Sequence, residues 1–304
     1  CNIIGSPELV ALALNTTKKD VVRKYLERSK QPIEPIVIDQ GSALCQQVVL
    51  TGDQVDLAKL PIPIWHVGDG GPYISFGVQI SKDPESGVRN ASILRFTGFY
   101  SKHNTRLPTM KVTCITSRKD AIYLGTYEGK PLVEDAIFKT VSYSAGILKD
   151  ASRVCPGLID LYVTPGGCTF YHAVAKIKKN QSGHARLAMN AIWATHLGKY
   201  LKQLIVVDEN IDITDPAQVE WAVATMVQPD RDILIQHRTP ANVLDPSQWP
   251  RGKASTLGID ATKKTIEEGG PGVDQYPQVI SHEPSPYWKR IQELGWREYI
   301  KRSS

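Results

Sequence analysis

The sequence lacks an apolar run long enough to cross a membrane, and its opening residues show no signal-peptide pattern. Its five cysteines are widely spaced and form no CxxC pair. Cys114 and Cys168 lie in apolar, β-like surroundings that are typical of buried small side chains. We therefore expect a reducing cytoplasm as the compartment and no insertion into a membrane.

A strong charge of either sign is also missing. The net charge of +5 is mild and spread along the chain. The short lysine run at 176–179 is more typical of a solvated strand end than of a nucleic-acid patch, so nucleic acid is not expected as a partner. No GxGxxG motif follows a predicted strand, which leaves a plain flavin oxidoreductase without support.

The residues that are present are those of an ordinary globular protein. With 304 residues, 41% hydrophobic and 22% charged, the chain can bury one large core or two moderate ones. Helical periodicity predicts helices at 7–14, 20–29, 133–154, 183–201, 217–226 and 285–302. Strand-like runs occur at 36–39, 46–50, 73–80, 88–95, 111–116, 121–126, 159–164, 171–178, 204–207 and 232–236. This alternation favours a layered, mixed α/β fold.

Segment 60–95 is the most informative part of the chain. Glycine-containing turns at 69–71 and 83–87 precede its two predicted strands. Asn90 and Arg95 lie near the end of the second strand. An amide and a guanidinium at this place suit an anionic or metal-bridged ligand.

The same segment contains the motifs LPIPIWH, DGGPYIS, KDPESG and RNASILR. Five more follow along the chain: FTGFYS, ITSRKDAIY, GKPLVED, IVVDENIDI and GKASTLGIDATKK. In this order, the sequence closely resembles the UbiD family of reversible decarboxylases, which use prenylated FMN. The resemblance runs through most of the chain and implies an enzyme of the carboxy-lyase class.

The resemblance is interrupted at one peptide bond, between Arg95 and Phe96. In the family, a central split β-barrel that holds the flavin stands here, and it carries both acids of a Glu–Arg–Glu catalytic network. A family segment that precedes the motif at 2–6 is also absent. Three explanations are open: these residues are the ordered part of a longer polypeptide, the barrel was removed deliberately, or the chain is a naturally reduced relative.

The first explanation is favoured, because the two ends left by removing an internal domain rarely lie one peptide bond apart. An intact mass near 33.6 kDa would contradict it.

The expected architecture is therefore UbiD-like and has three parts. Residues 1–95 form an N-terminal α/β unit that leads into the cofactor site, and residues 96–250 form a layered C-terminal α/β domain. Residues 251–304 form a cofactor-contacting loop and a C-terminal oligomerisation helix, and the chain is expected to be irregular over 239–279. The last helix either docks on a neighbouring subunit or packs within its own chain.

The resemblance also implies roles for single residues. Arg95 would be the catalytic arginine that holds the leaving carboxylate, and Asn90 would bind a divalent metal that bridges the flavin phosphate. The backbone of Ile93, Leu94 and Arg95 would lie against the flavin, and Lys253 would reach the cofactor. The plainer alternatives are a surface ion pair for Arg95, a hydrogen-bonding turn residue for Asn90 and a solvated turn for Lys253.

His172 lies where aromatic-acid members of the family place pocket residues, so it could orient a phenolic hydroxyl of the substrate. A satisfied core histidine is the alternative. The resulting expectation is decarboxylation of an aromatic or α,β-unsaturated acid with prenylated FMN, a divalent metal (Mn²⁺ or Mg²⁺) and K⁺ as a further candidate cation. A flavin prenyltransferase would supply the cofactor, and the protein would assemble as a homodimer or hexamer.

A second function stays open at this point. The chain could be a non-catalytic UbiD-like subunit or scaffold of a multi-subunit carboxylase, because the acids and the other metal ligands of the family are absent from it.

Overall fold

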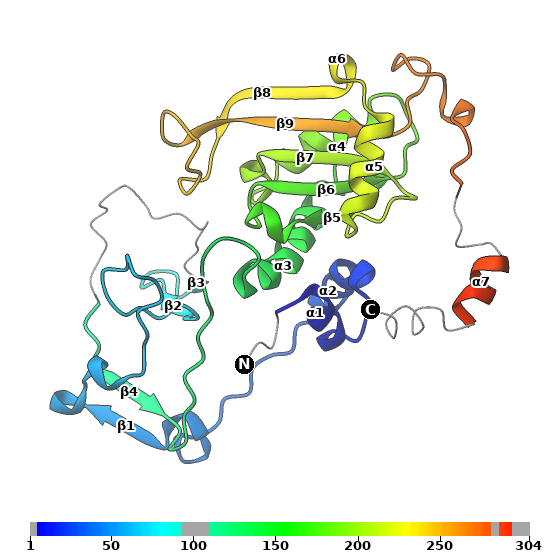
Figure 1. Ribbon diagram of the computed structural model, residues 1–304. Helices are drawn as coiled ribbons and strands as arrows, with labels where there is room; N and C mark the ends of the chain where they lie inside the picture. Colours follow the sequence, from blue (N-terminus) through cyan, green and yellow to red (C-terminus); the bar gives the residue numbers. More distant parts are fainter. Residues whose placement is uncertain (1–4, 93–109, 281–285, 294–304) are drawn as a thin grey trace. The chain divides into compact units, whose positions relative to one another are not determined.

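The computed structural model describes residues 5–92, 110–280 and 286–293 (Figure 1). It divides into two compact units, residues 1–262 and residues 263–304. In the described part of the second unit, helix α7 (Pro286–Glu293) lies within the predicted C-terminal helix. Within the described residues, no helix combines the length and the apolar character that a membrane span requires.

A five-stranded sheet forms the centre of the first unit. Its order is β5-β6-β7-β9-β8, with parallel pairing of β6, β7 and β9 and antiparallel pairing at both edges. The strands are β5 (Leu158–Val163), β6 (His172–Ile177), β7 (Gln203–Asp208), β8 (Ile233–Pro240) and β9 (Lys253–Ala261). The expected mixed, layered α/β fold is therefore confirmed.

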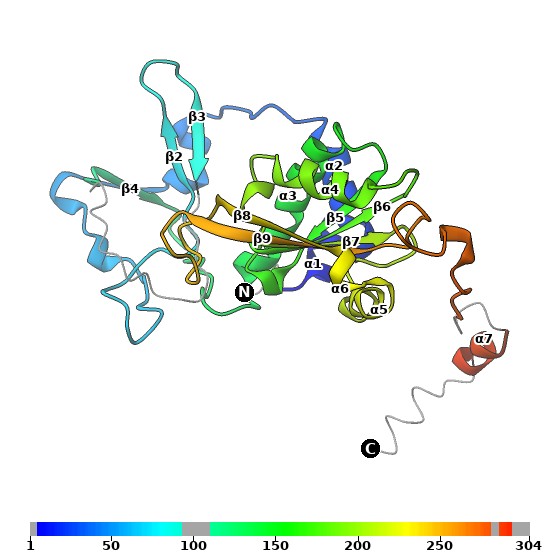
Figure 2. The ribbon, with the colours of Figure 1, turned by 90° about the horizontal axis from the view of Figure 1, so that it is seen from above.

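Helices cover both faces of this sheet. Helices α3 (Glu134–Ala151) and α4 (His184–Trp193) lie on one face, and α5 (Pro216–Met226) lies on the other (Figure 2). Successive residues of a strand point to opposite faces, so Leu161 joins the core under α3 and α4 while Tyr162 joins the core under α5. Short helix α6 (Pro229–Asp232) leads into β8.

The first two helices join the same core. Helices α1 (Pro7–Ala13) and α2 (Val21–Ser29) both contact α3, and Val10 and Val22 are buried in the core cluster. Both helices lie where the sequence predicts them. The Ser6 side chain caps α1 by accepting a hydrogen bond from the backbone N–H of Leu9.

A buried serine ties α3 to the edge of the sheet. The Ser144 hydroxyl donates to the carbonyl of Thr140 over 2.6 Å and accepts the backbone N–H of Val163 over 2.8 Å. Because Val163 is the last residue of β5, this bond fixes the position of α3 along the strand.

Two small antiparallel sheets contain the strands that the structure describes between residues 36 and 131. One pairs β1 (Val48–Thr51) with β4 (Cys114–Ser117), and the other pairs β2 (Gln79–Lys82) with β3 (Arg89–Ser92). Cys114 is exposed on the sheet of β1 and β4, and Cys168 is only half-buried. The expectation that both cysteines are buried is therefore wrong. A two-stranded sheet has too little cover to bury its side chains.

The sequence predicts more strand here than the structure contains. The predicted strands at 36–39 and 121–126 are irregular, and only the end of the predicted strand at 73–80 is extended and paired. The Ser75 hydroxyl accepts the backbone N–H of Thr126 over 3.0 Å. This hydrogen bond joins the two segments through a side chain, and neither segment forms a strand at these positions.

Helix α4 is shorter than the predicted helix at 183–201. A Cβ atom on Gly198 would lie 2.0 Å from the carbonyl oxygen of Ile192, so the chain turns tightly at this point. The Thr195 hydroxyl closes the turn by donating to Ile192 and accepting from the backbone N–H of Gly198. Local hydrogen bonding by threonine thus ends the helix after Trp193.

The prediction of irregular structure over 239–279 is wrong for β9, and residues 253–261 are a strand rather than a loop. The prediction rested on the Pro, Gly and Asp content of the whole stretch, which is typical of loops. Gly258 lies inside this strand. Here it makes room for α4: a Cβ atom on Gly258 would lie 2.5 Å from the Sδ of Met189 and 3.0 Å from the ring of Trp193. The glycine therefore serves packing and not a turn.

The outer strand β8 is interrupted near its end. Its pairing with β9 shifts between Gln236 and Thr239, and Arg238 there has a φ of +57°. This irregularity bends the free edge of the sheet.

A buried acid precedes α3. Glu128 is 1% exposed, and it lies near Asp135 and Lys139, which form an ion pair along the helix. Burial, and next the charge of Asp135, raise the pKa of Glu128 to about 8. Glu128 is thus mostly protonated at neutral pH in the folded chain.

We expect Gly258→Ala to lower the free energy of unfolding by about 1–3 kcal/mol, because the added methyl group overpacks the contact with Met189 and Trp193. Denaturant unfolding measures this loss. Gly166→Ala is the control, since its Cβ would meet no atom within 4 Å. Equal stability of the two variants would contradict the packing role of Gly258.

We expect the free energy of unfolding to fall between about pH 4.5 and pH 8 through Glu128. The folded chain keeps this proton while the unfolded chain releases it near pH 4.5, so rising pH favours unfolding until the folded group also ionises. Glu128→Gln should flatten this slope and be the more stable protein at pH 8. Glu27→Gln, which changes an exposed carboxylate, should keep the slope.

Candidate functional site

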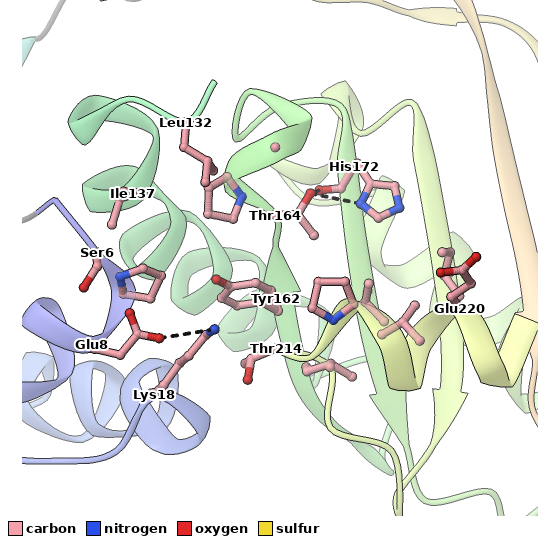
Figure 3. A pocket seen from close by; sticks show the side chains of 18 of the residues that line it. Ser6, Glu8, Lys18, Leu132, Ile137, Tyr162, Thr164, His172, Thr214 and Glu220 are labelled. Atoms are coloured by element: carbon pink, nitrogen blue, oxygen red, sulfur yellow. Dashed lines mark hydrogen bonds and ion pairs between the residues drawn. The ribbon is translucent and has the colours of Figure 1, made fainter. Parts of the chain in front are cut away.

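A cavity of about 870 Å³ lies against the sheet face that α5 covers (Figure 3). Strands β5, β6 and β7, the start of α3, helix α5 and the N-terminus of α1 all contribute to its wall. The lining residues are Gly5, Ser6, Pro7, Glu8, Lys18, Leu132, Ile137, Tyr162, Thr164, Pro165, Gly166, His172, Val174, Ile205, Ile213, Thr214, Pro216, Val219, Glu220 and Val223. A cavity of this size can hold a small organic ligand.

The floor of the cavity is apolar. Val174 and Ile205 come from neighbouring strands at directly paired positions, and Val219 and Val223 face them from one side of α5. The pairing rule of the sheet and the i, i+4 spacing of the helix place these four side chains together. Such a floor suits the flat, apolar face of an aromatic ring.

His172 is the central polar residue of the wall. Its Nδ1 lies 3.0 Å from the Thr164 hydroxyl, which also accepts the backbone N–H of Gly167 over 3.3 Å. The same hydroxyl also donates to the carbonyl oxygen of His172 over 3.4 Å, so Thr164 holds both the ring and the backbone of His172. Burial lowers the pKa of His172, so the neutral ring prevails at neutral pH.

The turn before His172 allows this contact. Gly167 ends the 3₁₀ turn at 165–167, and a Cβ atom there would lie 2.5 Å from the Cβ of His172. Cys168 and Thr169 follow with φ values of +55° and +56°. Two successive non-glycine residues in the left-handed region raise the free energy of the folded chain. Such backbone strain is common in turns that position functional side chains.

Other polar groups of the wall differ in charge. Burial raises the pKa of Tyr162 to about 12, so its phenol remains a neutral donor. At the opposite end, Lys18 lies 3.4 Å from Glu8, and both side chains are at least one-third exposed. The site therefore combines an apolar floor, neutral hydrogen-bonding groups, one partly solvated ion pair and the exposed side chain of Glu220 (Figure 3).

Lys253 lies toward the end of the sheet at which β6 and β7 begin. Gln203 of β7 pairs with His172 of β6 on one side and with Leu257 of β9 on the other. Lys253 is the first residue of β9 and comes four residues before Leu257. The side chain of Lys253 is exposed, and the preceding Gly252 has a φ of +85°. Lys253 and His172 therefore lie toward the same end of the sheet, but Lys253 is two strands away and about 13 Å further along.

The remaining predicted residues lie in or beyond the β2–β3 hairpin. Asn90 is exposed on β3 and pairs with Ser81. Ile93, Leu94 and Arg95 lie outside the described residues. Among the described residues, no group of three or more His, Cys, Asp or Glu side chains could hold a metal ion.

Sequence reasoning did not identify Thr164, Tyr162 or the α1 residues as parts of a site. The segment TPGG at 164–167 was the available signal, because proline and glycine directly after a strand often shape a binding turn. The contribution of Glu8 and Lys18 had no such signal, since it depends on packing between distant segments.

Two family models match the chain. The model for the C-terminal domain of 3-octaprenyl-4-hydroxybenzoate carboxy-lyase (UbiD) matches residues 137–261. The model for its Rift-related domain matches in two pieces, 36–97 and 95–131. The two pieces meet where the sequence predicts that the central barrel is left out.

Solved structures of UbiD-class enzymes share the fold. HmfF from Pelotomaculum thermopropionicum, in complex with FMN, has a TM-score of 0.75 at 24% identity, covering 91% of this chain and 84% of its own. Vanillic acid decarboxylase from Sedimentibacter hydroxybenzoicus in its closed form has a TM-score of 0.78 at 21% identity, covering 96% and 86%.

The 3,4-dihydroxybenzoic acid decarboxylase from Enterobacter cloacae has a TM-score of 0.74 at 18% identity, covering 94% of this chain and 85% of its own. At these identities the likeness establishes the fold, and the two family models establish the relationship. The chain belongs to the UbiD family of carboxy-lyases.

Proposed function

We propose that this protein catalyses the reversible, non-oxidative decarboxylation of an aromatic or α,β-unsaturated carboxylic acid with prenylated FMN. The match of both UbiD domain models in their order along the chain carries this proposal. Structures of HmfF with FMN and, in an evolved dimeric form, with prenylated FMN support the choice of cofactor. The relatives that act on vanillic and 3,4-dihydroxybenzoic acid support an aromatic substrate.

The described residues offer part of the donor set for such a cofactor. Asn90 presents an amide oxygen on an exposed strand, which suits a hard divalent cation such as Mn²⁺ or Mg²⁺. Lys253 presents an exposed ammonium group beside a glycine that allows a close backbone approach, which suits a phosphate or a ring oxygen. In this proposal Ile93, Leu94 and Arg95 contribute backbone contacts to the flavin.

Arg95 has the chemistry for holding the leaving group. A guanidinium stays charged at all relevant pH values and forms bidentate hydrogen bonds with a carboxylate. It would fix the carboxylate of the substrate in one orientation while the carbon–carbon bond breaks. When bound, prenylated FMN supplies the electron sink for the carbon that loses CO₂.

His172 would orient the substrate ring. A neutral imidazole whose Nδ1 is held by Thr164 can donate from Nε2 to a phenolic oxygen, while the apolar floor contacts the ring. This role rests on the cavity and on the low pKa of His172 together. K⁺ as a further cation, a cytoplasmic location and an assembly of two or six copies belong to the same proposal.

A non-catalytic subunit or scaffold is the second candidate. It is favoured by the observation that the described residues contain no cluster of acids and histidines that could hold a metal ion. The two candidates differ in cofactor binding, because only the enzyme needs a flavin.

The full-length protein, co-expressed with a flavin prenyltransferase, should carry a bound flavin in its absorbance spectrum and decarboxylate hydroxylated benzoic acids. Arg95→Ala should keep the spectrum and lose at least about 100-fold in kcat, since a group that stabilises developing charge commonly contributes that much. Arg89→Ala, on the same hairpin, is the control and should remain active. A protein without flavin supports the scaffold, and turnover by Arg95→Ala refutes the role of that residue.

His172→Phe should lower kcat/KM for hydroxylated aromatic acids by about 10- to 100-fold, because a buried substrate hydroxyl loses its partner. The same variant should be nearly unchanged toward acids that lack a ring hydroxyl. Steady-state kinetics with such a pair of substrates measures the difference, and His172→Gln, which keeps a donor, should recover part of the loss. Equal losses on both substrates would indicate a structural role only.

A further inference from the structure

A second, much smaller pocket lies at the end of the sheet where strands β6, β7 and β9 begin. Tyr171, which directly precedes β6, forms one side, and Thr256 of β9 forms another. Lys202, just before β7, and Asp245, from the loop between β8 and β9, complete the polar wall. These residues come from four separate parts of the chain, so only the folded sheet brings them together.

Two hydroxyl groups in this wall are buried without a partner among the described residues. The Tyr171 hydroxyl and the Thr256 Oγ1 are both shielded from solvent and make no hydrogen bond there. Burial, and next the charge of Asp245, raise the pKa of Tyr171 far above its usual value, so its hydroxyl stays protonated and can donate. A buried hydroxyl without a partner is costly, and two in one pocket require an explanation.

The charged part of the wall is satisfied by itself. The Lys202 ammonium donates to Asp245 Oδ2 over 3.1 Å and also to the Ser247 hydroxyl. Asp245 accepts the backbone N–H and the hydroxyl of Ser247 over 2.9 and 2.8 Å. Among the described residues, neither Lys202 nor Asp245 makes a hydrogen bond to the two hydroxyls, so a third group can supply one.

The size of the pocket decides what that group is. Its free space is about 10 Å³, which is about the amount that the centre of one water molecule needs. An organic ligand or a phosphate is far too large for this space. A metal cation would find a single carboxylate here, that of Asp245, which is already paired with Lys202.

We propose that one buried water molecule binds in this pocket and joins the hydroxyls of Tyr171 and Thr256. The water accepts the tyrosine proton and exchanges a further hydrogen bond with the threonine, so that both groups gain a partner. It thereby links β6 and β9 across the end of β7, where the strands themselves do not pair.

This water has a consequence for the loop at 241–252. The loop is fixed at its base by the bond from Ala241 N–H to the Gly252 carbonyl (3.1 Å) and at its middle by the Lys202–Asp245 pair. The water site adds an anchor directly beside these attachments. Because Lys253 follows the loop, the site would position it for the cofactor; this last step alone rests on the proposed function.

Denaturant unfolding of the full chain tests the site without any need for activity. If the water is present, Tyr171→Phe and Thr256→Val should each raise the unfolding equilibrium constant about five- to tenfold, because each removes a hydrogen bond of the water. In the double variant the unfolding equilibrium constant should rise by less than the product of the two single effects, since both variants act on one water molecule. Tyr25→Phe, which removes an exposed hydroxyl from α2, is the control and should be unchanged.

If the pocket holds no water, the two variants should lower the unfolding equilibrium constant instead of raising it. Removing a buried hydroxyl that has no partner should stabilise the chain, so unfolding constants at or below the wild-type value would overturn the proposal, as would effects that multiply exactly. Amide hydrogen exchange tests the consequence for the loop: in Tyr171→Phe the N–H of Ala241 should exchange faster, while that of Val163 on the far edge should not. Unchanged exchange at Ala241 would exclude the anchoring role.

Discussion

The pairing of β9 on both of its sides is the interaction on which the arrangement of the sheet depends. Its parallel bonds to β7 and antiparallel bonds to β8 join residues near 205, 235 and 257 into one layer. Without β9, the outer strand β8 would have no neighbour in the sheet. The absence of a side chain at Gly258 permits this pairing, because α4 packs directly above β9.

Local patterns predicted the elements well where one segment carried all the necessary information. Helix α5 begins with the capping Asp215 and Pro216, and α3 begins with two acids that complement the helix dipole. The same reasoning failed at β9, since the Pro, Gly and Asp content of residues 239–279 hid a strand that lies within them. It also could not show that α1 and α2 pack against α3, because periodicity reveals an apolar face but not its partner.

The site was predictable to a similar degree. Motif similarity identified His172, and the structure adds Thr164 as the residue that contacts its Nδ1. The pair is eight residues apart and meets only because β5 and β6 form an antiparallel pair around the TPGG turn. The predicted role of Arg95 stays a prediction, since residues 93–109 lie outside the described chain.

The bend at the end of β8 limits how copies of the chain can associate. A straight outer strand would offer a row of free amide and carbonyl groups onto which another molecule could add its own strand. The shifted register and the left-handed Arg238 break that row after a few residues. Only residues 233–236 of β8 are regular before this break, so the stretch to which a further strand could pair is short.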